Sequence, residues 1–344
     1  MPYRAVVVGA SGYSGAELLR LLAGHPAIEV SAATSREFAG ADIATVYPNL
    51  AAYAGRSFVA LDEADLEAAD IVFLALPHGA SMAVGAPLAA AGGRIVDFSA
   101  DFRLADAGLY RTWYGAEHSA PEWLGKWVYG LPELHRDQIR GAALVANPGC
   151  YPTAATLALA PLLAAGLIEP AGITIAASSG VSGAGRGMNA GVHFSHVDAS
   201  VKAYGLGTHK HTPEIEQELS IAAGAATTVT FVPHLVPTAR GLLATCVARL
   251  AAGATAASVR DAVAERYAGE PFVRATPSPP ETKYVSGSNG AHVHATADER
   301  TGAAIVVCAI DNLGKGAAGQ ALQNANLMLG LDETAGLTAG GIYP

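Results

Sequence analysis

The sequence predicts an α/β protein in which a doubly wound parallel sheet is followed by a second, α+β domain with a mixed, largely antiparallel sheet. Three observations lead to this expectation. Short apolar runs alternate with helical stretches as far as Cys150, and a glycine-rich turn follows the first run directly. After Cys150 the strand candidates lengthen, and loops rich in glycine and proline separate them, as at residues 275–290.

The first domain opens with residues 4–8, a nearly unbroken apolar run of the kind found in strands that are buried on both faces. Residues 16–24 follow as a helix that ends at a glycine. Because strands and helices continue to alternate, a doubly wound sheet is expected. The further elements expected here are strands at 28–34, 70–76 and 94–98 and a helix at 82–91.

The second domain begins with a long apolar helix, expected at residues 151–165. Its strands are expected at 173–177, 227–232, 242–250 and 303–310. The segment 312–330 has an apolar helical face that should pack back on the first domain. The residues of that face are Ala318, Ala321, Leu322, Ala325 and Leu329. The predicted boundaries are therefore 1–149 with 312–344 for the first domain and 150–311 for the second.

Charge and composition exclude several classes of function. The net charge is −9 and no stretch clusters lysine and arginine, so nucleic acid and anionic membranes are not expected partners. No run of about 18 apolar residues indicates a membrane span. The first residues lack a signal-peptide pattern, and the three cysteines are odd in number and widely spaced, which argues against a disulfide framework. A cytoplasmic protein with a small-molecule substrate is expected.

The turn after the first strand carries Gly9, Gly12 and Gly15 as GxxGxxG. Glycines at such a turn let backbone N–H groups approach a pyrophosphate, and the helix start supplies partial positive charge. A tight turn without a ligand would also use them, but the position after a first buried strand favours a dinucleotide. The other candidate cofactor contacts in this turn are Ser11, Tyr13 and Ser14.

The end of the second expected strand indicates which dinucleotide binds. An NAD enzyme usually has an acidic residue there, whereas this chain has Thr34, Ser35 and Arg36. A hydroxyl and a guanidinium suit a 2′-phosphate, so NADP(H) is expected as the cofactor. The alternative is that Arg36 is a solvated loop residue. Pro77, in the stretch 76–79 that ends another strand, is expected over the adenosine or pyrophosphate.

Cys150 stands in NPGCYPT, directly before a helix. A thiol attacks as its thiolate, and the partial positive charge and unpaired N–H groups of a helix start favour that anion. A buried structural thiol is the alternative; it suits Cys246 and Cys308, which lie inside apolar strands, better than a cysteine among loop-forming residues. Cys150 is therefore the candidate nucleophile.

His209 and His211 in GTHKHTPEIEQEL are the candidate proton donors and acceptors for such a thiol. Zinc binding is an alternative, with His292 and His294 as a second pair, but no HExxH or CxxC spacing supports it, and no metal is expected. The acidic residues that follow in the same segment are expected to form a solvated helix face. They are Glu214, Glu216 and Glu218.

Across nearly the whole chain, stretches such as GASGYSGAELLRLL, LALPHGAS, VDFSADFRL, NPGCYPTA, SSGVSGAGR, YGLGTHKHTPEIEQ and AIDNLGKGAAGQALQNAN occur in an order that resembles the N-acetyl-γ-glutamyl-phosphate reductase family of arginine biosynthesis. That family is related to the aspartate-semialdehyde dehydrogenases. The resemblance implies a Rossmann domain that binds NADPH, a catalytic and oligomerisation domain, and a homodimer or homotetramer. It implies reduction of N-acetyl-L-glutamyl 5-phosphate to the 5-semialdehyde through a thioester on a cysteine.

The resemblance also implies roles for individual residues. Cys150 would attack the acyl phosphate, and His211, with His209 close behind, would move the proton. Arg103 would hold the substrate phosphate, unless it forms a structural salt bridge with Asp97 or Asp101. The other implied substrate contacts are Asn147 and Arg186, and the implied nicotinamide contacts are Ser182, Gly183, Gly185 and Asn312.

Other functions remain open at this stage. The homologous lysine enzyme acts on an aminoadipyl phosphate that is longer by one methylene, although Tyr-Pro-Thr after the cysteine favours the arginine enzyme. An aspartate-semialdehyde dehydrogenase is compatible with the same chemistry. A non-enzymatic NADPH-binding sensor would need no thiol. A short-chain dehydrogenase is disfavoured because no Tyr-x-x-x-Lys occurs.

Overall fold

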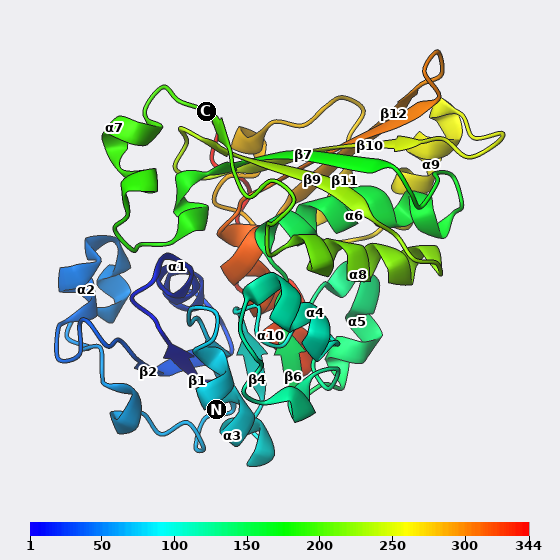
Figure 1. Ribbon diagram of the computed structural model, residues 1–344. Coiled ribbons are helices and arrows are strands. Elements are labelled where there is room, and N and C mark those ends of the chain that lie inside the picture. The colour runs from blue at the N-terminus through cyan, green and yellow to red at the C-terminus, as the bar shows by residue number, and fades with distance from the viewer. Residues whose placement is uncertain (344) are drawn as a thin grey trace. The chain divides into compact units, whose positions relative to one another are not determined.

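The structure is a computed structural model that describes residues 1–343. The chain divides into two compact units (Figure 1). Unit 1 comprises Met1–Pro148 and Ala317–Thr338, and unit 2 comprises Gly149–Gly316 with the described residues from Ala339 onward. No helix within residues 1–343 is both long and apolar enough to cross a membrane.

Unit 1 is built on a parallel six-stranded sheet in the order β2-β1-β3-β4-β6-β5. Its central strands are short and largely apolar, with Asp97 at the end of β4, which suits a sheet with helices on both faces. The strands are β1 (Tyr3–Val8), β2 (Ile28–Ala33), β3 (Ile71–Leu74), β4 (Ile95–Asp97), β5 (Val128–Tyr129) and β6 (Leu144–Ala146). This arrangement confirms the doubly wound parallel sheet.

Helices of unit 1 pack against this sheet at several points. Met82 and Leu88 of α3 and Tyr110 of α4 belong to a core cluster with Val6 and Val72 of the sheet. Helices α1 and α10 contact β1, β2 and β4. The helices of this unit are α1 (Tyr13–Leu22), α2 (Ile43–Val46), α3 (Ser81–Ala90), α4 (Ala107–Tyr114), α5 (Pro132–Arg140) and α10 (Gly319–Met328).

Helix α10 differs from the expectation of one apolar face, because every residue of the helix is buried. Its amide side chains satisfy neighbouring backbone instead of facing water. Asn324 Nδ2 donates to the carbonyl of Gly130 at 2.8 Å, and Asn326 Nδ2 donates to the carbonyl of Ala335 at 2.9 Å. A buried amide is tolerated when it is hydrogen-bonded, so hydrophobic periodicity alone underestimates how much of α10 is covered.

Unit 2 contains a mixed seven-stranded sheet in the order β11-β12-β13-β10-β7-β9-β8. The pairs β7–β9 and β11–β12 are parallel and the other four are antiparallel, as expected for a mixed, largely antiparallel sheet. The strands are β7 (Ile173–Gly180), β8 (Lys202–Ala203), β9 (Val229–Val236), β10 (Leu242–Arg249), β11 (Val273–Ala275), β12 (Ala291–Asp298) and β13 (Ala303–Ile310).

Helices α6, α8 and α9 lie on one side of this second sheet (Figure 1). Helix α6 contacts β10, β12 and β13, while α8 contacts β9 and α9 contacts β11 and β12. Along β7, β10 and β12, buried residues alternate with partly or fully exposed ones, as in a sheet with one packed face. The helices are α6 (Cys150–Ala164), α7 (Phe194–Val197), α8 (Thr212–Ala223) and α9 (Ala256–Arg266).

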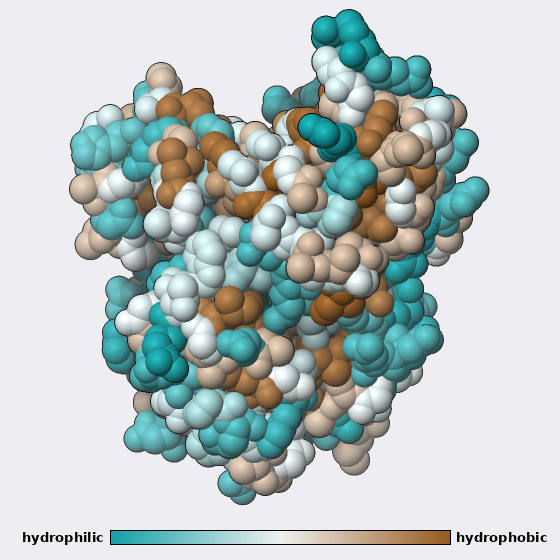
Figure 2. Space-filling view, turned by 45° about the vertical axis from the view of Figure 1, so that its right-hand side comes forward, coloured by the Kyte–Doolittle hydropathy of each residue, from teal (hydrophilic) through white to brown (hydrophobic). Residues whose placement is uncertain are grey.

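A hairpin joins β12 to β13 through Glu299 and Arg300, which are both exposed. Figure 2 shows hydrophilic residues at the tip of this hairpin, the uppermost point of that view. Glu299 and Arg300 therefore place charge at the tip of the hairpin, beyond the last paired residues of β12 and β13.

Candidate active site

The glycine turn between β1 and α1 is shaped for close backbone approach. Gly9 has φ +79°, and a Cβ there would lie 2.4 Å from the carbonyl oxygen of Ala75. A Cβ at Gly15 would lie 2.6 Å from the carbonyl oxygen of Gly9. Gly12 is different, because a Cβ there would meet only Gly9 O, at 3.6 Å. Gly9 and Gly15 are thus required by the turn itself, whereas Gly12 leaves room in front of the helix.

The amino end of α1 has the features of an anion site. Gly12 is its N-cap, no side chain caps the helix, and no acidic residue lies in its first turn. Helix N–H groups that lack an internal partner bind phosphates readily. Ser14 lies in this turn and is partly exposed, while Tyr13 is 39% exposed. The residues present therefore fit a bound dinucleotide, with its pyrophosphate at this helix start.

The end of β2 is tied to the same turn. Gly9 N–H donates to Thr34 Oγ1 at 3.2 Å, and the hydroxyls of Ser11 and Ser35 lie 2.7 Å apart. Ser35 is 2% exposed, while Arg36 beside it is exposed. The predicted 2′-phosphate contacts thus sit next to the glycine turn, with hydroxyls held in place and the guanidinium at the surface.

The loop of Pro77–Gly79 after β3 is exposed and is held from below by Asp101. The carboxylate of Asp101 accepts hydrogen bonds from the N–H groups of Gly79 at 2.8 Å and Met82 at 3.3 Å. It also accepts from the hydroxyl of Tyr110 at 3.1 Å, and it is fully buried. The Asp101 carboxylate already accepts hydrogen bonds from N–H groups at the amino end of α3. The start of α3 is therefore less available to an anionic ligand than the start of α1.

Arg103 and Asn147 lie together in unit 1. Arg103 is 7% exposed, and it donates from Nε to the carbonyl of Asn147 at 2.8 Å and from Nη2 to the carbonyl of Phe98 at 2.6 Å. The amide of Asn147 donates to the carbonyl of Ala317 and accepts from Asn324 Nδ2 at 3.0 Å. Both side chains therefore shape the end of β6, and their contact with substrate stays a prediction.

Cys150 is the first residue of α6 and is partly exposed, whereas Cys246 and Cys308 are fully buried in their strands. Gly149 is the N-cap, and no side chain caps the helix. Thr153 N–H donates to the carbonyl of Gly149 at 2.9 Å, which is the first hydrogen bond of the helix. The thiol thus lies where the helix dipole favours a negative charge.

His209 and His211 come together beside Tyr151, as neighbours in a ring cluster. The His209 ring lies 4.9 Å from the His211 ring and 5.6 Å from Tyr151, and it also contacts Tyr204 and Phe231 edge-on. The hydroxyl of Tyr204 donates to that of Tyr151 at 3.1 Å. Since Tyr151 follows Cys150 directly, this aromatic cluster lies against the start of α6.

The two histidines differ in their proton chemistry. His209 Nδ1 accepts a hydrogen bond from the N–H of His211 at 3.1 Å, which places the proton of the neutral ring on Nε2. Burial lowers the pKa of His209 to about 4, so this ring is neutral near pH 7. His209 is thereby suited to packing, and His211 is the better candidate to exchange a proton.

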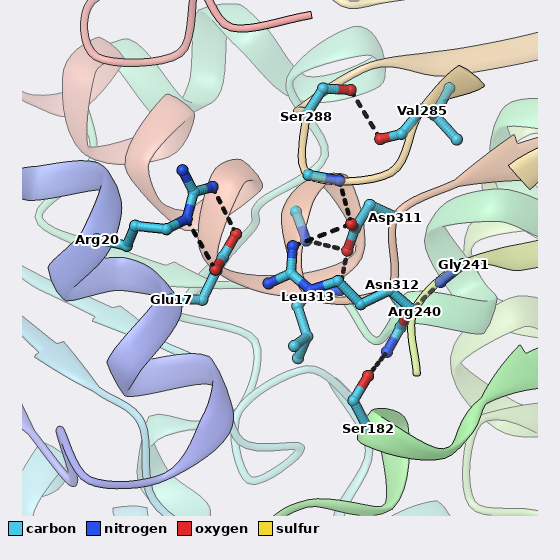
Figure 3. A network of polar contacts seen from close by, with 12 residues as sticks. Glu17, Arg20, Ser182, Arg240, Gly241, Val285, Ser288, Asp311, Asn312 and Leu313 are labelled. Carbon is cyan, nitrogen blue, oxygen red and sulfur yellow. Dashed lines mark hydrogen bonds and ion pairs between the residues drawn. The ribbon is translucent and has the colours of Figure 1, made fainter. Parts of the chain in front are cut away.

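Two of the predicted nicotinamide contacts in unit 2, Ser182 and Asn312, belong to one polar network (Figure 3). Asn312 Nδ2 donates to Ser182 Oγ at 2.8 Å, and Asn312 Oδ1 accepts from the N–H of Gly241 at 2.8 Å. A Cβ at Gly183 would lie 3.1 Å from Ser179 Oγ, while one at Gly185 would meet nothing within 4 Å. Asn312 therefore holds the turn Val181–Ala184 in shape, and contact with a nicotinamide remains a prediction.

Asp311 anchors the second half of the network. Its buried carboxylate pairs with Arg240 Nη1 at 3.1 Å and accepts from the N–H groups of Leu313 at 2.8 Å and Gly314 at 2.9 Å. Gly287 N–H donates to it as well. Arg186, the remaining substrate candidate, is partly exposed in the loop after Gly185. Sequence reasoning missed Asp311, since an aspartate at a strand end has many ordinary explanations.

The expectation for the acidic residues of α8 was wrong for two of them. Glu214 and Glu218 are each only 1% exposed, while Glu216 is partly exposed. Oε1 of Glu214 accepts a hydrogen bond from the N–H of Gly149 at 2.8 Å, and Oε1 of Glu216 accepts from the N–H of Val229 at 3.0 Å. These carboxylates bind backbone from other elements, which helical periodicity does not reveal.

The second histidine pair of the zinc alternative lies on a strand. His292 and His294 belong to β12, and His294 Nδ1 lies 2.9 Å from the carbonyl oxygen of Thr276. Over the part of the chain that the structure describes, no three or more His, Cys, Asp or Glu residues are grouped so as to hold a metal ion.

Comparison with known proteins places both units in one family. Residues 4–142 match the semialdehyde dehydrogenase NAD-binding domain, and residues 150–312 match the semialdehyde dehydrogenase dimerisation domain. Among solved structures, the chain is similar to aspartate semialdehyde dehydrogenase II from Vibrio cholerae, with a TM-score of 0.71 and 17% identity over 96% of this chain and 99% of that one. It is also similar to aspartate semialdehyde dehydrogenase with NADP from Candida albicans, with a TM-score of 0.66 and 16% identity over 95% and 98% of the chains. Identities this low establish the fold alone.

Curated relatives are much closer in sequence. A protein of Symbiobacterium thermophilum named N-acetyl-gamma-glutamyl-phosphate reductase is 53% identical over the full length of both chains. Relatives of the same name from Pelotomaculum thermopropionicum and Acidothermus cellulolyticus are 49% and 50% identical, again over both full lengths. This chain therefore belongs to the N-acetyl-γ-glutamyl-phosphate reductase family of oxidoreductases.

Proposed function

We propose that this enzyme reduces N-acetyl-L-glutamyl 5-phosphate to N-acetyl-L-glutamate 5-semialdehyde with NADPH, releasing phosphate, as a step of arginine biosynthesis. One observation carries the proposal above all: Cys150 lies at the uncapped start of α6, in the same unit as His211 at the start of α8. A thiol at a helix start beside a histidine is the arrangement that acyl transfer to sulfur needs.

In the first step the Cys150 thiolate attacks the carbonyl carbon of the acyl phosphate. The carbon–sulfur bond forms, the carbon–oxygen bond to phosphate breaks, and phosphate leaves with the electron pair. The product is a thioester on Cys150. Backbone N–H groups in the first turn of α6 have no partner within the helix and would stabilise the negative charge that develops on the carbonyl oxygen.

His211 is proposed to handle the proton. During reduction it donates a proton to the carbonyl oxygen of the bound acyl group, and when the aldehyde leaves it takes that proton back as the thiolate re-forms. His209 would support it through packing, because its ring is neutral near pH 7 and its Nδ1 already accepts from the His211 backbone. This division of roles is the finer part of the proposal.

NADPH, when bound, supplies the hydride. In unit 1 the open position at Gly12 and the uncapped start of α1 would receive the pyrophosphate. Ser11, Ser35 and the exposed Arg36 would contact the 2′-phosphate, and Pro77 would cover the adenosine side. In unit 2 the turn at Ser182–Gly185, braced by Asn312, would lie by the nicotinamide. Arg103, Asn147 and Arg186 remain the proposed contacts for the anionic groups of the substrate.

The activity test is reduction of NADP⁺ by N-acetylglutamate semialdehyde, followed with and without phosphate. The expected result is turnover that requires phosphate and that Cys150→Ser lowers by orders of magnitude while NADPH binding persists. Undiminished turnover in Cys150→Ser would refute the thioester route. Faster turnover with an aminoadipyl or aspartyl phosphate than with the acetylglutamyl one would replace the substrate proposed here.

The proposed partner is a second copy of this chain, bound through the sheet face of unit 2 that α6, α8 and α9 leave uncovered. Over β12, β13, β10, β7 and β9, cross-strand pairing arranges the middle of this face in three rows without a carboxylate, lysine or arginine. Charges lie only at its margins, at Arg274 beside His292 and at Arg249 and Asp298 in the next row. A two-fold contact sets each patch against its own copy, so like charges would oppose one another there. The rows are Thr296, Ile305, Val247, Thr174 and Thr230; His294, Val307, Thr245, Ala176 and Val232; and His292, Ala309, Leu243, Ser178 and His234.

The size of this face and the family match both support self-association. Strands about 4.8 Å apart and rows about 6.8 Å apart give roughly 500 Å² of flat area, against about 800 Å² per partner in a standard interface. Flanking loops would supply the rest. The domain that carries the sheet matches a family description that names dimerisation.

A charge placed in the middle strand tests this interface. Val247→Glu, at a side chain that is 37% exposed on β10, should shift the sedimentation coefficient to that of a monomer. Ile221→Glu on α8, where the side chain is 61% exposed, is the matched control and should leave assembly intact. A wild-type protein that is monomeric at micromolar concentration would overturn the proposal.

We further propose a cytoplasmic location, consistent with three cysteines that form no disulfide within the described residues.

A further inference from the structure

The carboxylate of Glu214 reaches the backbone directly before Cys150. Its Oε1 accepts a hydrogen bond from the N–H of Gly149 at 2.8 Å, and the Glu214 side chain is 1% exposed. Gly149 is the N-cap of α6 and has an extended conformation, so its N–H lies outside the hydrogen-bond ladder of that helix. A side chain of another helix, α8, thus supplies the acceptor that α6 cannot.

The carbonyl of Gly149 is held from the other side. It accepts hydrogen bonds from both N–H and Oγ1 of Thr153, each at 2.9 Å. Cys150 itself has little room, because a Cβ at Gly316 would lie 2.8 Å from the Cβ of Cys150. The backbone that carries the thiol is therefore confined by three neighbours, and Glu214 is the one that brings a carboxylate, a strong acceptor.

Glu214 also shares a helical turn with the proposed acid–base residue. His211 is the N-cap of α8, and Glu214 is the third residue of that helix. One short piece of backbone therefore carries both His211 and the carboxylate that grips the peptide of Gly149. An acidic residue in a first turn is favoured by the helix dipole in any protein, but the dipole does not require a bond to Gly149.

We propose that Glu214 is a positioning residue, which holds Cys150 and His211 in register through the Gly149 peptide and does not touch the substrate. The inference rests on the proposed function and adds a residue to it. Acyl transfer depends steeply on placement, since a misplacement of about 1 Å changes rate by about 10²-fold. A carboxylate that fixes both reacting groups from one helix turn would control that placement.

The test compares three variants under the assay above. Glu214→Leu keeps the bulk of the side chain and removes the acceptor, so kcat should fall at least ~30-fold with KM within about 3-fold. Glu214→Gln keeps an amide oxygen for Gly149 and should recover kcat to within about 5-fold of wild type. Glu216→Leu is the matched control, because Glu216 also accepts from backbone, at Val229 N, but away from Cys150. It should leave kcat unchanged.

A second readout needs no substrate or cofactor. The rate at which iodoacetamide alkylates Cys150 should change at least tenfold in Glu214→Leu, show a displaced pH profile, and stay at the wild-type value in Glu216→Leu. Cys150→Ser gives the background from the buried Cys246 and Cys308. If the variants differ from the wild type in alkylation rate as expected, but the wild type reduces no acyl phosphate, the proposed function fails and the positioning role stands.

Equal kcat and equal alkylation rates in Glu214→Leu and Glu216→Leu would overturn the inference. Where Glu214→Leu does not fold, as judged by circular dichroism, Glu214→Asp replaces it. The aspartate side chain is shorter by one methylene and does not reach Gly149 N. Glu214→Asp should therefore show the low kcat expected for Glu214→Leu, although it keeps the negative charge. An aspartate variant as fast as the glutamine variant would then overturn the positioning role.

Discussion

The N–H of His211 donates a hydrogen bond to Nδ1 of His209 at 3.1 Å, and this bond distinguishes two histidines that look equivalent in the sequence. Nδ1 of His209 is occupied by this hydrogen bond, and burial lowers the pKa of His209 to about 4. His211→Asn should therefore lower kcat by about 10²- to 10⁴-fold, the usual contribution of an acid–base group. His209→Asn should lower it by less than about 10-fold, through loss of packing against Tyr151.

Steady-state kinetics across pH would check this division. The wild-type profile of kcat/KM should show an ionisation that persists in His209→Asn and is absent in His211→Asn. A profile that follows His209 instead would reverse the two roles.

Asp97, which is fully buried, and His209, which is partly buried, predict opposite effects of pH on the stability of the two units. Burial raises the pKa of Asp97, in unit 1, from 3.8 to about 6, and the hydrogen bonds from Ser99 oppose that rise. Asp97 is thus protonated more readily when folded, and its contribution to stability is full below about pH 4 and lost as pH rises through about 6. His209 in unit 2 has a lowered pKa, so its contribution is present above about pH 6.5 and lost as pH falls through about 4.

Thermal unfolding of Asp97→Asn and His209→Asn at about pH 7 and about pH 4.5 tests these signs. As pH falls, the stability of Asp97→Asn relative to wild type should decrease and that of His209→Asn should increase. Each change is at most about 3 kcal/mol, from roughly two pKa units at 1.4 kcal/mol each. Shifts of the same sign in both variants would show that burial does not control these ionisations.

Substitutions at Gly9 and Gly12 should affect different properties: folding at Gly9 and cofactor binding at Gly12. Gly9→Ala places a methyl group 2.4 Å from Ala75 O at φ +79°, so the melting temperature of unit 1 should drop by several degrees, as for other losses of about 1–3 kcal/mol. Gly12→Val meets no such contact and should fold normally, yet its side chain would fill the space in front of α1. NADPH fluorescence titration should show binding weakened at least ~10-fold in Gly12→Val; tight binding there would remove the pyrophosphate from this helix start.

The parts of this fold that sequence predicted are those with a local physical signature. The buried run of β1, the turn at Gly9 and the helix after Cys150 each follow from residues that are adjacent in the chain. Strands β5 and β8 have only two residues each, too few for any periodicity to appear. Strand β12 was missed because its two histidines, which alternate with small apolar residues, were weighed as metal ligands.

The residues of the candidate site were likewise predicted only where the sequence carries a local signature. Cys150 stood out because loop-forming residues surround it, and the histidines because they pair in sequence with a helix start. Glu214 was expected on a solvated helix face and Asp101 only as a possible salt-bridge partner of Arg103, since each binds backbone that lies far along the chain, at Gly149 and Gly79. A carboxylate that binds such a distant N–H looks the same in sequence as one that faces water. Only the fold distinguishes them.

Arg36 is the residue on which the choice of dinucleotide depends. It is exposed at the end of β2, beside the paired hydroxyls of Ser11 and Ser35. A bidentate guanidinium–phosphate contact at such a site contributes about 1.5–3 kcal/mol, so Arg36→Ala should lower kcat/KM for NADPH by about 10- to 100-fold. NADH carries no 2′-phosphate, so its kcat/KM should stay within about 2-fold of the wild-type value. The ratio of the two coenzymes, measured on one preparation, removes any general loss of activity; an unchanged ratio would mean that Arg36 is a solvated loop residue.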